Sequence, residues 1–224
     1  IPSSPMATPS VPAGTLIHSR DSPYARRVRI VLAELGLPYD SRLHPTVFAI
    51  ADLAGINPNL RIPVWQDDRG TLFDSGLIVE YLLTCYGAQA PGGPPSEARP
   101  PLARSMRRAE SGWADAMLLA TLDGLTDAGF LLRQLALSGV DEEQVRYLRR
   151  VRQRIPSALD WLEAQATPAG FVPGTFSAPD VWLVCALEWA QFRGTYSWRG
   201  RPKLEAIVAR YAARPSVSGS AHPQ

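Results

Sequence analysis

Residues 15–36 read TLIHSRDSPYARRVRIVLAELG. Thr15–His18 is a short apolar run typical of a buried strand, and Tyr24–Leu35 carries apolar residues at helical spacing. Gly36, followed by leucine and proline, is a typical end signal for a helix. A strand followed so closely by a helix predicts that the first part of the chain packs a helix on a sheet.

The rest of the first half continues this alternation of strand-like and helical segments. The turn Asp67-Asp-Arg-Gly70 lies between two strand-like runs and predicts a hairpin. The predicted segments are a strand at Tyr39–Leu43, a poorly defined segment at Val47–Leu53, hairpin strands at Pro63–Gln66 and Thr71–Phe73, and a helix at Ser75–Tyr86. We interpret the order as βαβαββα, that of an α/β thioredoxin-like domain in which helices cover a small mixed sheet.

The second half carries only helical periodicity, which predicts an all-α helical bundle. Ser177 and Asp180 form a capping-box signal for one of its helices. The helices are expected at Leu102–Leu137, Asp141–Ala166, Val181–Trp189 and Pro202–Ala213. Residues 88–101 are so rich in proline and glycine that they predict a linker. The predicted division is a disordered leader at 1–14, the thioredoxin-like domain at 15–87, the linker, and the helical domain at 102–224.

Composition excludes several classes of function. The 224 residues contain 23 Lys and Arg against 21 Asp and Glu, so the net charge of +2 provides no basic field for a nucleic-acid partner. No apolar run is long enough to span a membrane. The two cysteines, Cys85 and Cys185, lie far apart in apolar helical patterns and predict neither a disulfide framework nor a metal site. We therefore expect a cytoplasmic protein that binds no metal.

Ser22 and Pro23 lie at the start of the first predicted helix. Serine is favoured at the N-cap and proline at the first helical position, so the pair can be explained by helix initiation alone. The helix N-terminus also carries partial positive charge, and the Ser22 hydroxyl can donate a hydrogen bond to a thiolate placed there. The thiolate would belong to a ligand, because no cysteine lies near Ser22.

Two further motifs have a structural explanation and a functional one. Pro63 can simply mark the edge of a sheet, but a cis Ile62–Pro63 bond would expose the Ile62 backbone to an extended peptide, with Arg61 beside it for a carboxylate. Asp74 and Ser75 can simply cap a helix, but they also offer an acceptor for an ammonium and donors for a carboxylate. Together the motifs indicate one ligand: a small peptide with a thiol, a free carboxylate and a zwitterionic end.

Three stretches resemble the glutathione-site motifs of serine-type members of the cytosolic glutathione S-transferase superfamily. They are SPYARRVRIVLAELG at 22–36, NPNLRIPV at 57–64 and DSGLIVEYL at 74–82. In the helical half, Leu122–Ala128 and Arg214–Val217 resemble small bacterial YibF-like transferases. The resemblance covers roughly Thr15 to His222, and the combination of motifs in this order is far more specific than any one of them.

The resemblance implies a role for each matching residue. Ser22 matches the thiol-activating serine, Ile62 the backbone partner of the cysteinyl unit, and Pro63 the cis-proline. Arg61 matches a position, usually lysine, that faces the glycine carboxylate. The pair that holds the γ-glutamyl end is matched by Asp74 and Ser75, and Tyr24 is a packing residue and second-choice thiol donor. The chain departs from the pattern at Leu60, where glycine is usual.

The function implied is conjugation of the glutathione thiolate, glutathione being the co-substrate, to a small hydrophobic electrophile by a homodimeric detoxification enzyme. The electrophile pocket would lie between the domains, where Trp113 and Met117 are candidates, although an aromatic residue and a methionine at this spacing are more often core. Two alternatives remain open. One is a catalytically silent binding module like the stringent-starvation proteins, and the other is a glutathione-dependent lyase or isomerase.

Overall fold

The structure is a computed structural model that describes residues 12–44, 50–87, 113–172 and 174–222. Most of the predicted leader, the whole linker and the expected helical start at 102–112 lie outside these residues. The strands form one four-stranded sheet in the order β2-β1-β3-β4. The strands are β1 (Thr15–His18), β2 (Asp40–Leu43), β3 (Val64–Asp67) and β4 (Gly70–Phe73). Strand β1 is parallel to β2 and antiparallel to β3, which confirms the predicted mixed sheet.

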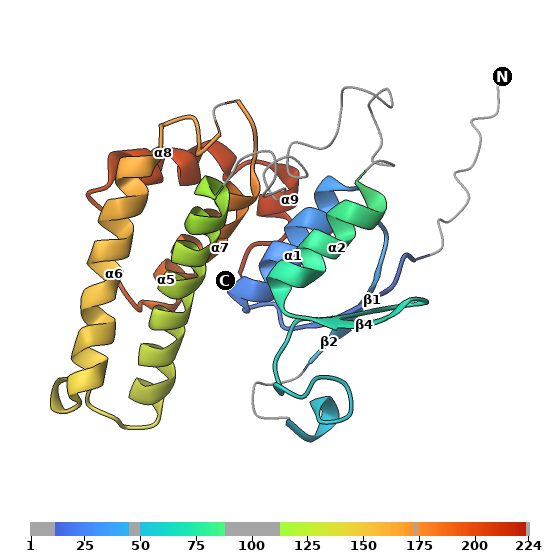
Figure 1. The fold of residues 1–224 in the computed structure, drawn as a ribbon, viewed down its shortest axis with the longest axis horizontal. Coiled ribbons are helices and arrows are strands. Elements are labelled where there is room, and N and C mark those ends of the chain that lie inside the picture. The colour runs from blue at the N-terminus through green and yellow to red at the C-terminus, as the bar shows by residue number, and fades with distance from the viewer. Residues whose placement is uncertain (1–11, 45–49, 88–112, 173, 223–224) are drawn as a thin grey trace.

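Two helices, α1 (Pro23–Glu34) and α2 (Ser75–Tyr86), pack together over one face of the sheet (Figure 1). The opposite face carries a small apolar cluster of Ile17, Leu53 and Val64. Leu53 belongs to the 3₁₀ helix η1 (Ile50–Leu53), the described part of the segment predicted poorly from sequence. The second helix of the predicted βαβαββα order is therefore a single 3₁₀ turn in the described residues.

In the described residues of the second half, all of the named secondary-structure elements are helices. These elements are α5 (Ala114–Leu137), η2 (Glu142–Gln144), α6 (Arg146–Gln165), α7 (Ala178–Arg193), α8 (Pro202–Tyr211) and α9 (Pro215–Ser218). Helices α5 and α6 lie side by side, and α7 packs against both α5 and α1 (Figure 1). The Ser177 N–H donates to the Asp180 carboxylate at 2.9 Å, which confirms the capping box of α7. None of the described helices has the length and apolar character needed to cross a bilayer.

Two arginines of α1 are buried where the first domain meets the helical domain. Arg26 and Arg27 are 0% and 1% exposed, and this burial was not predicted. Arg26 lies 2.6 Å from a Glu188 carboxylate oxygen on α7, and Arg27 pairs with Asp123 on α5. Burial of a charged group is costly unless it is paired, so these contacts join the domains through specific partners as well as through apolar packing.

The end of the chain returns to α1. Arg26 donates to the Val217 carbonyl at 3.2 Å, and Arg29 donates to the Ser220 carbonyl at 3.0 Å. At the other end of α1, Arg214 makes two hydrogen bonds to Glu34 at 2.7 and 2.6 Å. Residues 214–220 are therefore held against α1 by hydrogen bonds to Arg26, Arg29 and Glu34.

His222 lies in this same cationic region. Its ring stacks on Phe192 with centroids 4.9 Å apart, and neither ring nitrogen has a hydrogen-bond partner among the residues described. Burial lowers the pKa of His222 to about 4, and repulsion from the neighbouring cations Arg26, Arg29 and Arg193 acts in the same direction, against an opposing effect of Asp21. The folded protein therefore keeps this ring neutral.

We expect the free energy of unfolding to fall as pH decreases from about 6.5 to about 4, because the unfolded histidine takes up a proton that the folded state excludes. Above pH 6.5 the contribution is fully present. The variant His222→Phe keeps the stacking and cannot titrate, so it should lose less stability than the wild type over this window. Urea unfolding of both proteins at neutral and mildly acidic pH measures the difference; equal losses would show that His222 is not responsible.

Candidate functional site

A cleft of about 540 Å³ opens between the two domains. Its walls come from the start of α1, the loop before β3, the start of α2 and the middle of α5. The lining residues are Tyr24, Asn57, Asn59, Arg61, Ile62, Pro63, Asp74, Ser75, Asp123 and Asp127. The structure thus brings together every residue predicted to bind glutathione except Ser22, which lies two positions before Tyr24.

Ser22 occupies the N-cap of α1, as predicted from the Ser-Pro pair. Its Oγ accepts a hydrogen bond from the Ala25 N–H at 3.2 Å, and the side chain is half-buried. Because the oxygen accepts this bond, the hydroxyl proton can be donated to a group in front of the helix. The helix N-terminus stabilises negative charge at the same place, so the position suits a thiolate.

The loop before β3 holds its peptide groups in a fixed arrangement. The Ile62–Pro63 bond is cis. The Asn57 side chain accepts from the Asn59 N–H at 2.9 Å and donates to the Arg61 carbonyl at 2.7 Å. Within the described part of the chain, neither the N–H nor the carbonyl of Ile62 makes a hydrogen bond. The backbone of Ile62 is therefore available to an extended ligand in the cleft.

Leu60 explains why glycine is usual at its position in the motif. Its φ is 54°, in the left-handed region that side chains with a Cβ seldom adopt. The loop keeps this conformation, because the Leu60 N–H donates to the Asn57 carbonyl at 2.9 Å. Leucine therefore occupies a position whose backbone conformation favours glycine.

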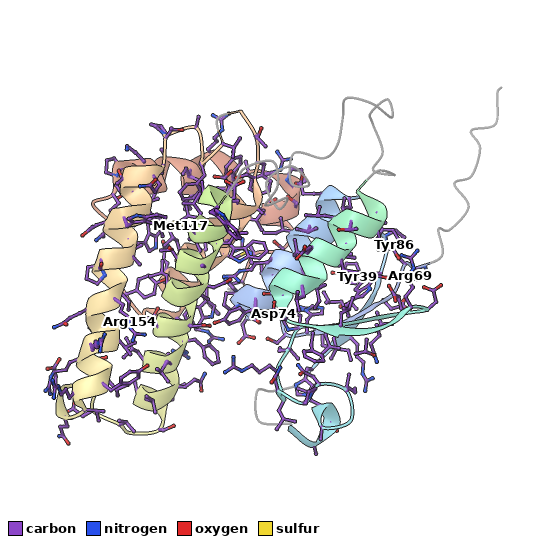
Figure 2. The ribbon with its side chains drawn as sticks, in the orientation of Figure 1. Tyr39, Arg69, Asp74, Tyr86, Met117 and Arg154 are labelled. Carbon is purple, nitrogen blue, oxygen red and sulfur yellow. The ribbon has the colours of Figure 1, made fainter. Side chains whose placement is uncertain are left out.

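The start of α2 supplies the opposite end of the cleft. Asp74, with φ of 78°, is the N-cap, and its Oδ1 accepts from the Gly76 and Leu77 N–H groups at 2.9 and 3.1 Å. Its side chain is exposed at the lower end of α2 (Figure 2), so the other carboxylate oxygen can meet an ammonium. Ser75, which follows it, is buried at the first helical position.

Tyr24 faces the helical domain. Its hydroxyl donates to the Asp127 carboxylate on α5. Burial and this hydrogen bond to a carboxylate both raise the pKa of Tyr24, so the phenol stays protonated at neutral pH. Since its proton is already engaged by Asp127, the structure favours Ser22 over Tyr24 as the donor to a sulfur.

Asp123 and Asp127 line the cleft, and neither of them was predicted as a site residue. Asp123 accepts from Arg27 and from the Trp182 indole N–H, the latter at 3.1 Å. The two aspartates lie four residues apart and so share one face of α5. The spacing of the two aspartates within 122–128 is the one feature of the sequence that could have indicated them. Their partners on α1, Arg27 and Tyr24, lie about a hundred positions away in the sequence.

Trp113 and Met117 do not line the cleft. They are 71% and 54% exposed, so they are not core residues either. Met117 lies near the upper end of α5, whereas Asp74 lies at the lower end of α2 (Figure 2). The ten positions between Trp113 and Asp123 correspond to a rise of about 15 Å along a helix, which explains why the cleft meets α5 further along.

The described residues include no group of three or more His, Cys, Asp or Glu side chains that could hold a metal ion. Cys185 is fully buried, and burial raises the pKa of its thiol, so it is not poised as a nucleophile. The described lining of the cleft offers hydroxyl, carboxylate, carboxamide, guanidinium and backbone groups.

Two family models match the chain: the glutathione S-transferase N-terminal domain at residues 16–94 and the glutathione S-transferase C-terminal domain at 146–210. The Escherichia coli protein named uncharacterized GST-like protein YibF is 27% identical over 215 residues, covering 93% of this chain and 98% of that protein. A stringent starvation protein A homolog from Pasteurella multocida is also 27% identical, over 92% of this chain and 89% of its own length.

Solved structures of glutathione transferases are also similar to this chain. A glutathione transferase family member from Pseudomonas fluorescens, with bound glutathione, is 31% identical with a TM-score of 0.72, covering 94% of this chain and 100% of that chain. A glutathione S-transferase from Methylobacterium radiotolerans, in complex with glutathione sulfonate, is 25% identical with a TM-score of 0.73, over 94% and 96% of the two chains.

Proposed function

Because this chain belongs to the glutathione S-transferase family, we propose that it is an enzyme that transfers glutathione to a small electrophilic molecule. One observation carries the proposal. The cleft collects Arg61, Ile62 with its unpaired backbone, and the Asp74–Ser75 pair. Ser22, the N-cap of α1, lies two positions before Tyr24, which lines the same cleft. A module that only binds another protein has no need of this set.

Each part of the tripeptide has a complementary group in the cleft. In the proposed complex, Asp74 receives the γ-glutamyl ammonium, and Ser75 donates to the neighbouring carboxylate at the start of α2. The cysteinyl unit pairs with the Ile62 backbone, and Arg61 binds the glycine carboxylate. This places the sulfur toward the N-terminus of α1, where Ser22 donates to it.

The proposed reaction is nucleophilic substitution or addition by the bound thiolate. The thiol loses its proton to solvent, the Ser22 hydroxyl and the helix N-terminus stabilise the sulfur anion, and the sulfur forms a bond to the electrophilic carbon. With an aryl chloride the carbon–chlorine bond breaks and chloride leaves with the electron pair. No covalent bond to the protein is formed. We further propose a cytoplasmic homodimer with a role in detoxification, as the family resemblance implies.

The second candidate is a binding module without catalysis. It is suggested by the relatives named stringent starvation protein A homologs, which match most of the chain. Two measurements separate the candidates. Calorimetric titration with glutathione detects the tripeptide site, and a chlorodinitrobenzene assay detects turnover. Binding with turnover supports the enzyme, whereas absence of both supports the module.

We expect Asp74→Asn to raise the KM for glutathione about tenfold with little change in kcat, because a charge-assisted contact to the ammonium is lost in ground state and transition state alike. Asparagine tolerates the left-handed backbone of Asp74 and can still cap α2. Steady-state kinetics with varied glutathione measure the effect. Asp68→Asn, in the exposed hairpin turn, is the matched control, and an unchanged KM in Asp74→Asn would remove Asp74 from the site.

A further inference from the structure

The charges of the cleft are unevenly distributed. The charged residues that line it are one arginine and three aspartates: Arg61, Asp74, Asp123 and Asp127. In the proposed glutathione complex, Arg61 is matched by the glycine carboxylate and Asp74 by the ammonium. The two aspartates of α5 lie on the wall of the cleft that belongs to the helical domain, where the second substrate would bind.

Asp123 is already neutralised by the protein. It pairs with Arg27, and it also accepts from the Trp182 indole N–H at 3.1 Å. Arg27 is held in place: it also donates to the Thr126 hydroxyl at 3.1 Å and stacks over Trp182, 4.7 Å from the ring centroid. Because its side chain is 1% exposed and held by these contacts, Arg27 is not free to form an ion pair with a different carboxylate.

Asp127 differs from Asp123 in this respect. Its one hydrogen bond in the described residues comes from the Tyr24 hydroxyl, which is neutral, and no arginine, lysine or histidine among them forms an ion pair with it. The side chain is exposed to the cleft. Tyr24 thus fixes the direction of the carboxylate without cancelling its charge.

We propose that Asp127 determines specificity for the second substrate and selects an electrophile that carries a cationic group, such as a protonated amine or a quaternary ammonium. The inference rests on the proposed function, since it concerns the partner of glutathione in the same cleft. It narrows the expected small hydrophobic electrophile to one with a positive charge close to the reacting carbon. A cation there completes the charge pairing of the cleft, whereas an anion faces an unopposed carboxylate.

The test uses two aryl chlorides with the same 4-chloro-3-nitrophenyl core, one bearing a trimethylammonium-methyl group and the other a carboxylate para to the chlorine. Each enzymatic kcat/KM is divided by the rate constant for free glutathione, which removes the difference in intrinsic reactivity. We expect the normalised values to favour the cation about tenfold, the size of effect that one partly solvated charge contact at about 4 Å produces. Added salt should reduce the preference.

The decisive variant is Asp127→Asn, because asparagine keeps the shape and the acceptor for Tyr24 and removes only the charge. The cation preference should fall to within about threefold in this variant. Asp115→Asn, in the first turn of the same helix and outside the cleft, should keep the wild-type preference. Equal use of both substrates by the wild type, or an unchanged preference in Asp127→Asn, overturns the inference.

Failure of the inference is distinguishable from failure of the proposed function. If glutathione binds and chlorodinitrobenzene is conjugated but the cation is not preferred, the transferase stands and Asp127 has no such role. If glutathione does not bind and no chloride is released from any substrate, the transferase is wrong and the inference falls with it.

Discussion

The variant Ser22→Ala is expected to conjugate glutathione to chlorodinitrobenzene about 10²-fold more slowly than the wild type, with little change in glutathione affinity. In the proposed complex the hydroxyl donates to the sulfur where negative charge is concentrated, and removal of one such preorganised donor costs about 10² to 10³ in rate. Contacts to the other parts of glutathione remain. The loss should therefore appear mainly in kcat, with the pKa of the bound thiol shifted toward that of free glutathione.

Ser22 also caps α1, so its loss costs about 1 kcal/mol of stability, and the assay has to be run well below the unfolding temperature. Ser22→Thr is the matched control, because threonine retains both a hydroxyl donor and an N-cap acceptor. The ultraviolet absorbance of the bound thiolate against pH separates the chemical role from the structural one. Wild-type turnover in Ser22→Ala would exclude Ser22 from the mechanism.

The variant Glu188→Gln is expected to lower the free energy of unfolding by about 3 kcal/mol, because it leaves the guanidinium of Arg26 buried without a counterion. Arg26 is 0% exposed and Glu188 25%, so solvent offsets only part of the loss. Urea unfolding measures the change. Asp160→Asn is the surface comparison: this carboxylate pairs with Arg201 at 2.7 Å but is 70% exposed, and its loss should cost at most about 1 kcal/mol. Equal effects of the two variants would show that burial does not set the strength of the Arg26 pair.

Short-range signals predicted most of the fold. Serine and proline at 22 and 23 gave the start of α1, the turn at 67–70 gave the hairpin, and the capping box of Ser177 and Asp180 gave the start of α7. Each signal works within a few residues, because caps and turns satisfy the backbone locally. The helix expected at Pro202–Ala213 is observed as α8, which ends at Tyr211, and the short helix α9 that Pro215 opens was not predicted.

Most cleft-lining residues of the thioredoxin-like domain could be predicted from the sequence. Those of α5, Asp123 and Asp127, could not. Arg61, Ile62 and Asp74 lie in short motifs, and their binding roles can be predicted from the residues next to them in the sequence. The roles of Asp123 and Asp127 depend on α1, which reaches them only when the domains pack. The same reason explains the buried Arg26, whose charge suggests exposure until its partner on α7 is known.

The contacts of α7 with both α5 and α1 restrict how far the two domains can move relative to each other. One continuous apolar core includes Leu16 of the sheet, Val28 of α1 and Val184 of α7, so the two halves cannot hinge apart without exposing it. We therefore expect ligands to enter and leave the cleft while the two domains keep their relative positions. On this view, ligands of different size are accommodated by exposed side chains that line the cleft, among them Asn59 and Arg61.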